Sequence, residues 1–485
     1  MAFLKNSRPR RPGAYVNFEA AASTVLPPSQ GSVLAAPATH DWGPYKQGVL
    51  VTDYEQFKAI YGTTDSPLQR AVMQAFKGEG ILNRAGAGGV LVHRFGGSAA
   101  AKATRTVINT AGSPVTGLTL TAKYEGTRGN SLRVTSQDNA ADSANNDFII
   151  YDDTVEVERY VYADTDIAGL AAVINLVSDW ATAVANVDGV ALNTAVSASA
   201  FTGGNDGSTV LAADWTDVRT ALGSKPFSVL GLYDMTDSGV LASFKTWSQG
   251  LNAIGTRFMT VVGGASNDTA SSALVRSAAL NDPNFVNLGV GTLVDDELGT
   301  LSTAQLATRI GGIMCARGES AGITFVRLAG ISRVNDGPTA SQIDQCFDGG
   351  VTVFAEDAYA PAPVHTEKGL TTYTTTDDAA VPYAIFREPK FMRIMHGIEL
   401  EAKRLGTEPG FLGERPVNDK TRQWAVGEMQ SRMDARERLE IIQPGSVVSV
   451  DRDPPPSDDD NFVALRVPVK FSRDVEQFYL TTTVG

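Results

Sequence analysis

The last 25 residues constrain the fold of this chain more than any other stretch. They read NFVALRVPVKFSRDVEQFYLTTTVG, and apolar residues alternate with polar ones at Val463, Leu465, Val467 and Val469. A period of two predicts a strand with one buried face. Pro468 has no N–H to donate, which places this strand at the edge of a sheet or at a bulge.

A second extended run follows the short polar break at residues 472–474 and contains Val475, Phe478, Tyr479 and Leu480. We expect no further chain to fold back onto this run. It must therefore pair with its own core, pair with another chain, or fray.

The other end of the chain poses the same question. A cluster of Pro, Arg and Gly at residues 8–13 precedes an alternating stretch that includes Tyr15, Val16 and Phe18. The pattern predicts one strand. Two interpretations remain open, an edge strand beside a frayed terminus or a strand donated to a neighbour.

Composition limits the class of protein. The chain has 485 residues, of which 43% are hydrophobic and 20% are charged, and its net charge is −13. A free-standing nucleic-acid binder is usually basic, so this class loses support.

Cys315 and Cys346 provide no disulfide framework, and we expect both to be small core residues. The sequence shows no signal peptide and no run of 18 apolar residues, so we expect a soluble protein without membrane insertion.

Several domains follow from the periodicities along the chain. Helical and buried-strand patterns alternate between residues 208 and 357, which predicts a parallel sheet covered on both faces. The stretch before it is rich in Thr, Ala, Asp and Asn and reads as mostly β. We expect a mixed α/β and α+β protein with an N-terminal arm (1–25), a first part of the core (26–100), a β-rich insertion (101–204), an α/β core (205–360), a C-terminal α+β domain (361–471) and a C-terminal arm (472–485).

One short motif suggests an enzyme. Gly318-Glu319-Ser320-Ala321-Gly322 matches the G-x-S-x-G nucleophile elbow, which requires a strand before the serine and a helix after it. Here the periodicity predicts the reverse, a helix at 303–316 and a strand at Ile323–Arg327. We therefore expect a turn and no catalytic residue, and a hydrolase that uses Ser320 is kept as an alternative.

Metal and cofactor motifs are equally weak. The four histidines, His40, His93, His365 and His396, are not spaced as metal ligands. The glycine-rich stretches lack the spacing of a nucleotide-binding loop. We expect neither a cofactor nor a metal.

Positive charge gathers in two predicted helices. Residues 387–438 contain 11 Lys and Arg against 9 Asp and Glu, so the remaining chain carries −15. The charges form either two solvated helix faces or a surface that docks on an acidic protein partner, where charge would set register and association rate. The residues that would form such a surface are Lys390, Arg393, Lys403, Arg432, Arg436 and Arg438.

Four stretches, taken in order, resemble the contractile-tail sheath proteins of phages and tailocins. The first is R-P-G-A-Y-V at residues 11–16, and the second is the block 31–62 with its W-G-P turn at 42–44. The third is A-K-Y-E-G-T-R-G-N at 122–130, and the last is V-P-V-K-F-S-R-D-V-E-Q-F-Y-L at 467–480.

This resemblance implies a subtilisin-like α/β core without protease chemistry. It also implies a structural subunit that polymerises with itself as stacked hexameric rings around an inner tail tube protein and contracts. Baseplate and tail terminator proteins would be further partners, and nucleic acid would not be one. The particle would be a virion tail or tailocin assembled in the bacterial cytoplasm.

The resemblance also assigns roles to residues. The arm residues Tyr15, Val16, Phe18, Val475, Phe478, Tyr479 and Leu480 would be donated between subunits, which is strand addition through backbone hydrogen bonds. Val463, Leu465, Val467 and Val469 would belong to the accepting sheet, and the six basic residues named above would face the tube. A secreted surface-layer protein remains a further alternative.

Overall fold

The computed structural model describes residues 33–474, except 80–84, 143, 195–197, 208, 358–359, 361, 375–382, 408–410 and 453–461. The described residues divide into two compact units, with unit 1 drawn from Met1–Ala36, Ala71–Leu91 and Lys225–Gly485 and unit 2 from Pro37–Arg70 and Val92–Ser224. Each unit is considered by itself.

A mostly parallel sheet forms the centre of the α/β region. Its strand order is β18-β17-β13-β12-β11-β1-β3-β2. Strands β1, β11, β12, β13 and β17 pair in parallel, whereas β17 and β18 pair antiparallel. The predicted parallel sheet is thus confirmed. The bounds are β1 Val33–Thr39, β2 Gly48–Val51, β3 Gly89–Phe95, β11 Val229–Gly231, β12 Met259–Gly263, β13 Phe285–Gly289, β17 Val351–Glu356 and β18 Val364–Thr366.

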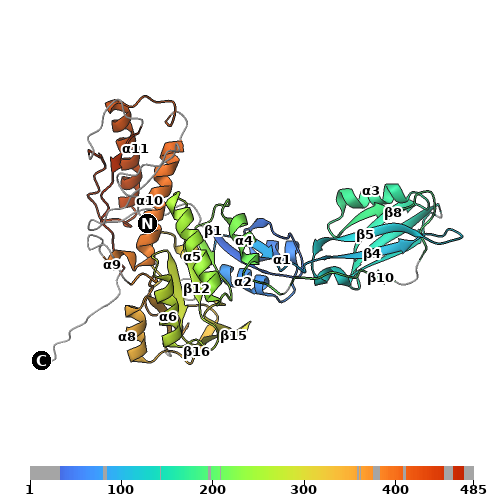
Figure 1. Cartoon of the computed structure of the whole chain (residues 1–485), viewed down its shortest axis with the longest axis horizontal. Coiled ribbons are helices and arrows are strands. Elements are labelled where there is room, and N and C mark those ends of the chain that lie inside the picture. Colours follow the sequence, from blue (N-terminus) through green and yellow to red (C-terminus); the bar gives the residue numbers. More distant parts are fainter. Residues whose placement is uncertain are drawn as a thin grey trace. The chain divides into compact units, whose positions relative to one another are not determined.

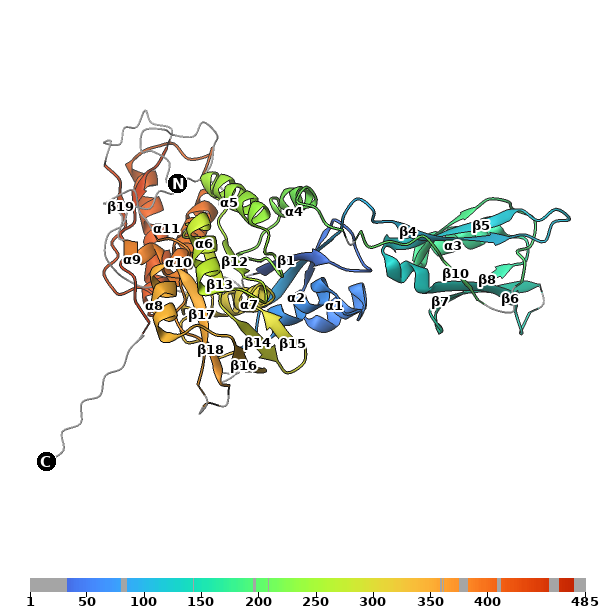
Figure 2. The ribbon, with the colours of Figure 1, turned by 60° about the horizontal axis from the view of Figure 1, so that its bottom comes forward.

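Helices flank this sheet in unit 1 (Figures 1 and 2). Helix α7 is buried along almost its whole length, and two glycines allow it to pack closely. A Cβ on Gly312 would lie 2.1 Å from the backbone oxygen of Ala75, and one on Gly311 would lie 2.7 Å from Leu34. The helices are α2 Pro67–Phe76, α5 Ser238–Ala253, α6 Ala270–Leu280, α7 Ala307–Arg317 and α8 Ala340–Asp348.

A second, antiparallel sheet of unit 1 was not predicted. It has the order β15-β14-β16, with β14 at Thr292–Asp295, β15 at Gly299–Ser302 and β16 at Ile331–Asn335. The strand predicted at Ile323–Arg327 is wrong, because these residues form turns and isolated bridges. Phe325 has a φ of 54°, which is incompatible with a regular strand.

Unit 2 contains a β-sandwich. One sheet has the order β4-β5-β9 and the other β10-β6-β7-β8, and the two lie as separate layers in Figure 2. At the N-terminus of helix α3, the Asp166 carboxylate accepts a hydrogen bond from the backbone N–H of Gly169. The bounds are β4 Lys102–Ile108, β5 Thr116–Glu125, β6 Leu132–Asp138, β7 Asn145–Asp152, β8 Val155–Ala163, α3 Ile167–Val177, β9 Ala181–Ala185 and β10 Ser199–Ala200.

The rest of unit 2 follows local sequence signals. Helix α1 (Tyr54–Tyr61) begins after Asp53, whose carboxylate accepts a hydrogen bond from the backbone N–H of Gln56 at 2.7 Å. Helix α4 (Asp214–Leu222) buries Trp215 against the ring of Phe95, with 4.5 Å between the centroids.

The C-terminal part of unit 1 contains two long helices, α10 (Pro389–Thr407) and α11 (Asp419–Glu437), which contact each other. The short helix α9 (Tyr383–Phe386) precedes them, and the two-residue strands β19 (Ser449–Val450) and β20 (Leu465–Arg466) follow. Phe391, Ile394, Ile398, Met429 and Met433 form the centre of their apolar core.

Candidate assembly site in the C-terminal region

The alternating segment near the C-terminus packs one face on α10 and α11. Leu465, Val467, Val469 and Phe471 are half-buried against the apolar core of these helices, whereas Arg466, Pro468 and Lys470 are exposed. The ring of Phe471 stacks on Phe391 with 4.8 Å between centroids. The predicted one-sided burial is therefore confirmed, although the regular strand β20 spans only two of the residues expected in it.

The backbone of this segment is only partly paired. Strand β20 pairs antiparallel with β19, and Phe471 forms a bridge with Ile442. Among the described residues, no strand pairs with positions 467–470. The accepting role of Val463, Leu465, Val467 and Val469 stays a prediction that this geometry allows. The arm residues Tyr15, Val16, Phe18, Val475, Phe478, Tyr479 and Leu480 lie outside the described residues.

Three of the six basic residues expected on a tube-facing surface are buried in the interior of the protein. Lys390, Arg393 and Arg436 are 4%, 7% and 3% exposed. Arg393 donates to the carbonyl oxygens of Met314 at 2.6 Å and Ala321 at 2.5 Å. Burial lowers the pKa of Arg393 to about 10, which leaves it charged at neutral pH. A buried guanidinium or ammonium group cannot present its charge to a partner while these contacts hold.

Arg436 belongs to a network of charges between α10, α11 and the loop after α7. Its guanidinium lies 3.9 Å from Glu319 and 3.7 Å from Glu401. The Glu319 carboxylate lies so close to α10 that a Cβ on Gly397 would come within 1.9 Å of it. Only glycine fits at position 397 without a shift of this carboxylate.

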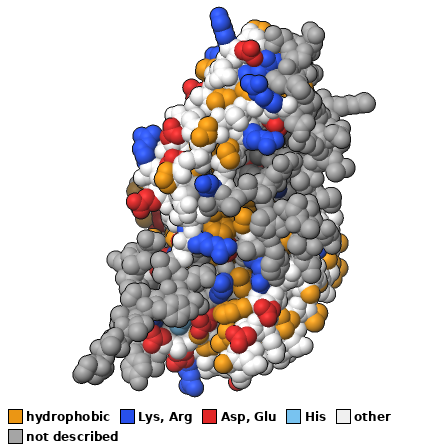
Figure 3. Space-filling model, turned by 90° about the vertical axis from the view of Figure 1, so that its left-hand side faces the viewer, with side chains coloured by type: hydrophobic (Ala, Val, Ile, Leu, Met, Phe, Trp, Pro, Cys, Tyr) orange, Lys and Arg blue, Asp and Glu red, His pale blue; other side chains and the backbone are white. Residues whose placement is uncertain are grey.

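The other three basic residues are less buried. Lys403 is 4.0 Å from Glu399, Arg432 is 3.3 Å from Glu401, and the exposed Arg438 donates to the carbonyl oxygen of Asp434 at 3.3 Å. On the face shown in Figure 3, basic and acidic side chains are interspersed. Lys403 and Arg432 thus each lie close to an acidic residue of α10.

Sequence reasoning missed one buried ion pair altogether. Arg257, which lies just before β12, donates to the carboxylate of Glu399 on α10, and Glu399 is 2% exposed. Burial raises the pKa of Glu399 above its usual range, and the charge of Arg257 opposes this shift. No local periodicity reports such a pair, because 142 residues separate its members.

The loop at 318–322 is not a nucleophile elbow. It follows helix α7 instead of a strand, and no helix follows it. The hydroxyl of Ser320 donates to the carbonyl oxygen of Arg317 at 2.7 Å. The His40 ring bonds with Ser66 and the carbonyl of Tyr61, and His396 bonds with Asn284.

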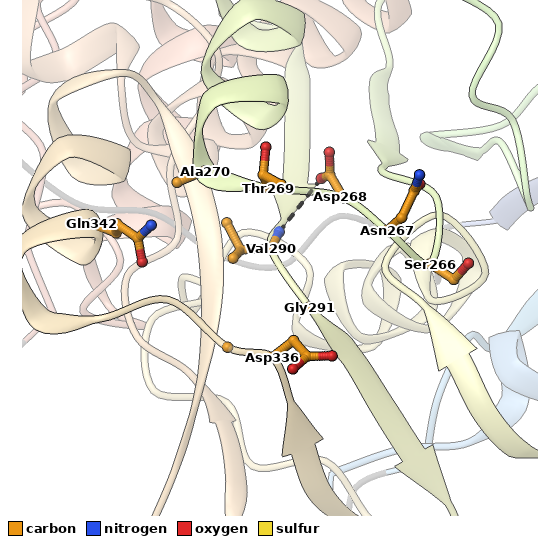
Figure 4. Close-up of a pocket in the computed structure, with 10 residues that line it drawn as sticks. Ser266, Asn267, Asp268, Thr269, Ala270, Val290, Gly291, Asp336 and Gln342 are labelled. Carbon is orange, nitrogen blue, oxygen red and sulfur yellow. Dashed lines mark hydrogen bonds between the residues drawn. The ribbon is translucent and has the colours of Figure 1, made fainter.

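Figure 4 shows a pocket of about 420 Å³ at the carboxyl ends of β12 and β13. Asp268, Asp336 and Gln342 contribute polar groups to its lining. The carboxylate of Asp268 is already engaged by Arg276, at 2.7 Å and 3.1 Å. Within the described ranges, no group of three His, Cys, Asp or Glu side chains could hold a metal ion. Both cysteines are free and buried, as expected.

In the part of the chain that the structure describes, no helix combines the length and apolar character needed to cross a bilayer.

One domain of this chain and its fold as a whole are similar to phage tail sheath proteins. Residues 96–206 match the family model of the phage tail sheath protein beta-sandwich domain. The sheath tail protein of Desulfitobacterium hafniense is 18% identical, and its structure superposes with a TM-score of 0.67 over 94% of this chain and 99% of that one.

Two further proteins are similar. The sheath of an extracellular contractile injection system (PVC) in its contracted state is 10% identical, with a TM-score of 0.53 over 99% of this chain and 98% of that one. The uncharacterized protein YqbK of Bacillus subtilis is 22% identical over 408 residues, which cover 82% of this chain and 79% of YqbK. The resemblance to contractile-tail sheath proteins is therefore confirmed.

Proposed function

We propose that this chain is the structural sheath subunit of a contractile injection apparatus and is not an enzyme. The observation that carries the proposal is the fold that this chain shares with a sheath tail protein over 99% of that protein's length. The β-sandwich of this chain also matches a tail sheath family model. Fold alone does not define function, so the assembly must be tested directly.

In the proposed assembly, subunits stack as hexameric rings around an inner tube and contract as rigid bodies. The α/β sheet of unit 1 corresponds to a subtilisin-like core without protease chemistry. The particle is a phage tail or tailocin tail, assembled in the bacterial cytoplasm, and its other partners are the baseplate and tail terminator proteins.

Strand exchange is the proposed link between subunits. The inward side chains of Leu465, Val467 and Val469 fix which face of the segment is buried, and this also fixes the direction of its backbone groups. A strand added there would gain main-chain hydrogen bonds. Donation from head to tail does not close on itself, so it generates a helical lattice.

We propose a tube-facing surface with three of the six basic residues expected from the sequence. Lys403, Arg432 and Arg438 remain its basic members, because the other three residues are engaged inside the chain. Since these charges have acidic neighbours, we expect them to set register more than affinity.

Negative-stain electron microscopy of the purified full chain tests the proposal. We expect tubes of uniform diameter, and a variant that lacks residues 475–485 should give only discrete particles while keeping its thermal unfolding transition. Long tubes from the truncated variant would exclude strand donation by this arm. Discrete particles from the intact chain, with or without a tube protein, would contradict the sheath function.

A further inference from the structure

The last four described residues, 471–474, are held against the start of α10. Phe471 stacks on Phe391, Arg473 lies 3.6 Å from Glu388, and Asp474 lies 2.5 Å from the ammonium group of Lys390. These contacts are of different strength, because the side chains differ greatly in exposure. Asp474 immediately precedes Val475, the first of the arm residues proposed to be donated, so its contacts fix where the donated part of the arm begins.

The buried ammonium group of Lys390 needs the carboxylate of Asp474 as a counter-ion. Its side chain is 6% exposed, and it is the second residue of α10. Burial in a region of low polarity and the positive end of the helix dipole both disfavour an ammonium group at this position. A carboxylate beside it offsets both effects. Without Asp474, Lys390 would lose its strongest counter-ion and remain buried.

The second oxygen of Asp474 reaches a different element. It accepts a hydrogen bond from the backbone N–H of Gly322 at 2.8 Å. Gly322 ends the G-x-S-x-G loop, which had no role in the proposed function. One carboxylate thus joins α10 to the loop after α7.

That loop is itself tied into the core. Arg317, the last residue of α7, donates to the carbonyl oxygen of Gly322, and its guanidinium pairs with Glu79 at 2.5 Å. Both side chains of this pair are at most 10% exposed. Arg393 on α10 donates to the adjacent carbonyl of Ala321. A continuous path of polar contacts therefore runs from Asp474, whose side chain is 39% exposed, through partly buried contacts to α7 and α10.

We propose that Asp474 is the anchor of the C-terminal arm, a positioning residue that fixes the point at which the arm leaves the subunit. Lys390 and the N–H of Gly322 hold its carboxylate. The G-x-S-x-G loop supports this anchor. A pulling force on the arm would be transmitted through this loop to α7 and α10. This inference rests on the proposed sheath function, because an arm shared with a neighbouring subunit is what needs a fixed origin.

The neighbouring residue supplies a matched control. Arg473 also forms an ion pair with a residue at the start of α10, but its side chain is 61% exposed and the pair is 3.6 Å long. Exposed pairs of this kind contribute little. Arg473→Gln changes one charge at the same place without touching the anchor.

The test compares Asp474→Asn, Lys390→Met, Lys390→Arg and Arg473→Gln in the full chain. Hydrogen exchange of the unpolymerised protein reports on the backbone of 465–474, and electron microscopy reports on tubes. Asp474→Asn keeps an acceptor for Gly322 but leaves the ammonium group without its counter-ion. We expect it to exchange at least about tenfold faster than wild type and to lose most tubes. Lys390→Met should also speed the exchange of 465–474 and reduce the yield of tubes. Lys390→Arg, which keeps the positive charge, should behave nearly like wild type in both measurements.

Arg473→Gln should match the wild type in exchange and in tube yield. Equal exchange and equal tube yield for Asp474→Asn and Arg473→Gln would overturn the anchor and leave the sheath function intact. If the wild type forms no tubes, the sheath function fails, and the exchange difference between the two variants alone decides the anchor.

Discussion

The β-sandwich of unit 2 and the C-terminal region of unit 1 are stabilised in different ways. The sandwich encloses an apolar core in which Leu118, Leu120, Phe148 and Ile150 have no exposed surface. The C-terminal helices also have an apolar core, but the charged side chains of Arg393, Arg436 and the pair Arg257–Glu399 tie them to the rest of unit 1. Apolar packing is non-directional, whereas a buried charge is costly when its partner is removed.

The first prediction gives the largest effect and addresses the apolar region. Leu120→Ala should lower the opening free energy of the sandwich by about 3 kcal/mol, because it removes buried methyl groups and leaves a cavity. Hydrogen exchange of peptides from β5 and β6 in the full chain measures this change. Val184→Ala on β9, where the side chain is 61% exposed, is the control and should change it by less than about 0.5 kcal/mol. Equal effects of the two substitutions would contradict the assigned core.

The second prediction addresses the ionic region. Arg257→Met leaves the buried Glu399 without its main partner and should destabilise α10 by about 2–3 kcal/mol. The double variant with Glu399→Leu should recover to within about 1 kcal/mol of wild type, since apolar pairs often replace buried ion pairs at little cost. Denaturant unfolding with exchange of α10 peptides measures both.

Lys46→Met is the control for this pair, because Lys46 and Asp217 form an exposed ion pair with side chains 42% and 56% exposed. It should cost less than about 1 kcal/mol. A double variant of Arg257 and Glu399 that is no more stable than the single variant would show that the pair is irreplaceable.

The third prediction uses a polar group that lies buried without a partner. His93 on β3 has no exposed surface, and neither ring nitrogen has a hydrogen-bond partner among the described residues. Burial, aided by the charge of Lys46, lowers the pKa of His93 from 6.5 to about 4. The unfolded chain therefore binds a proton between pH 6.5 and 4 that the folded chain does not.

Stability from this histidine is complete above pH 6.5 and is lost as the pH falls toward 4. By pH 5 the loss should be about 2 kcal/mol. Thermal unfolding of wild type and His93→Leu across this range isolates the contribution, because all other titrating groups are shared. Parallel pH profiles of the two proteins would rule out a depressed pKa at His93.

The contrast between the two regions also explains what could be predicted from the sequence. The parallel sheet and the one-sided burial of Leu465, Val467 and Val469 match their predictions, because local periodicity determines them. The short strands β14 and β15 were missed, since four residues beside a turn carry little period-two signal. The prediction that Lys390 and Arg393 lie on an outer surface was wrong for a related reason. Contacts with residues far away in the sequence bury them, and a charge in a helical pattern does not reveal such contacts.

The discontinuous sequence of unit 1 has a consequence for synthesis on the ribosome. Strand β1 pairs with β11, almost two hundred residues later, and β17 follows more than a hundred residues after that. The β-sandwich pairs its named strands over shorter separations, of at most 67 residues (Leu118 with Ala185), and ends near residue 206. The nascent chain can therefore complete the sandwich while β1 still awaits its partner β11. During translation, the inserted domain should fold first and the domain that hosts it last.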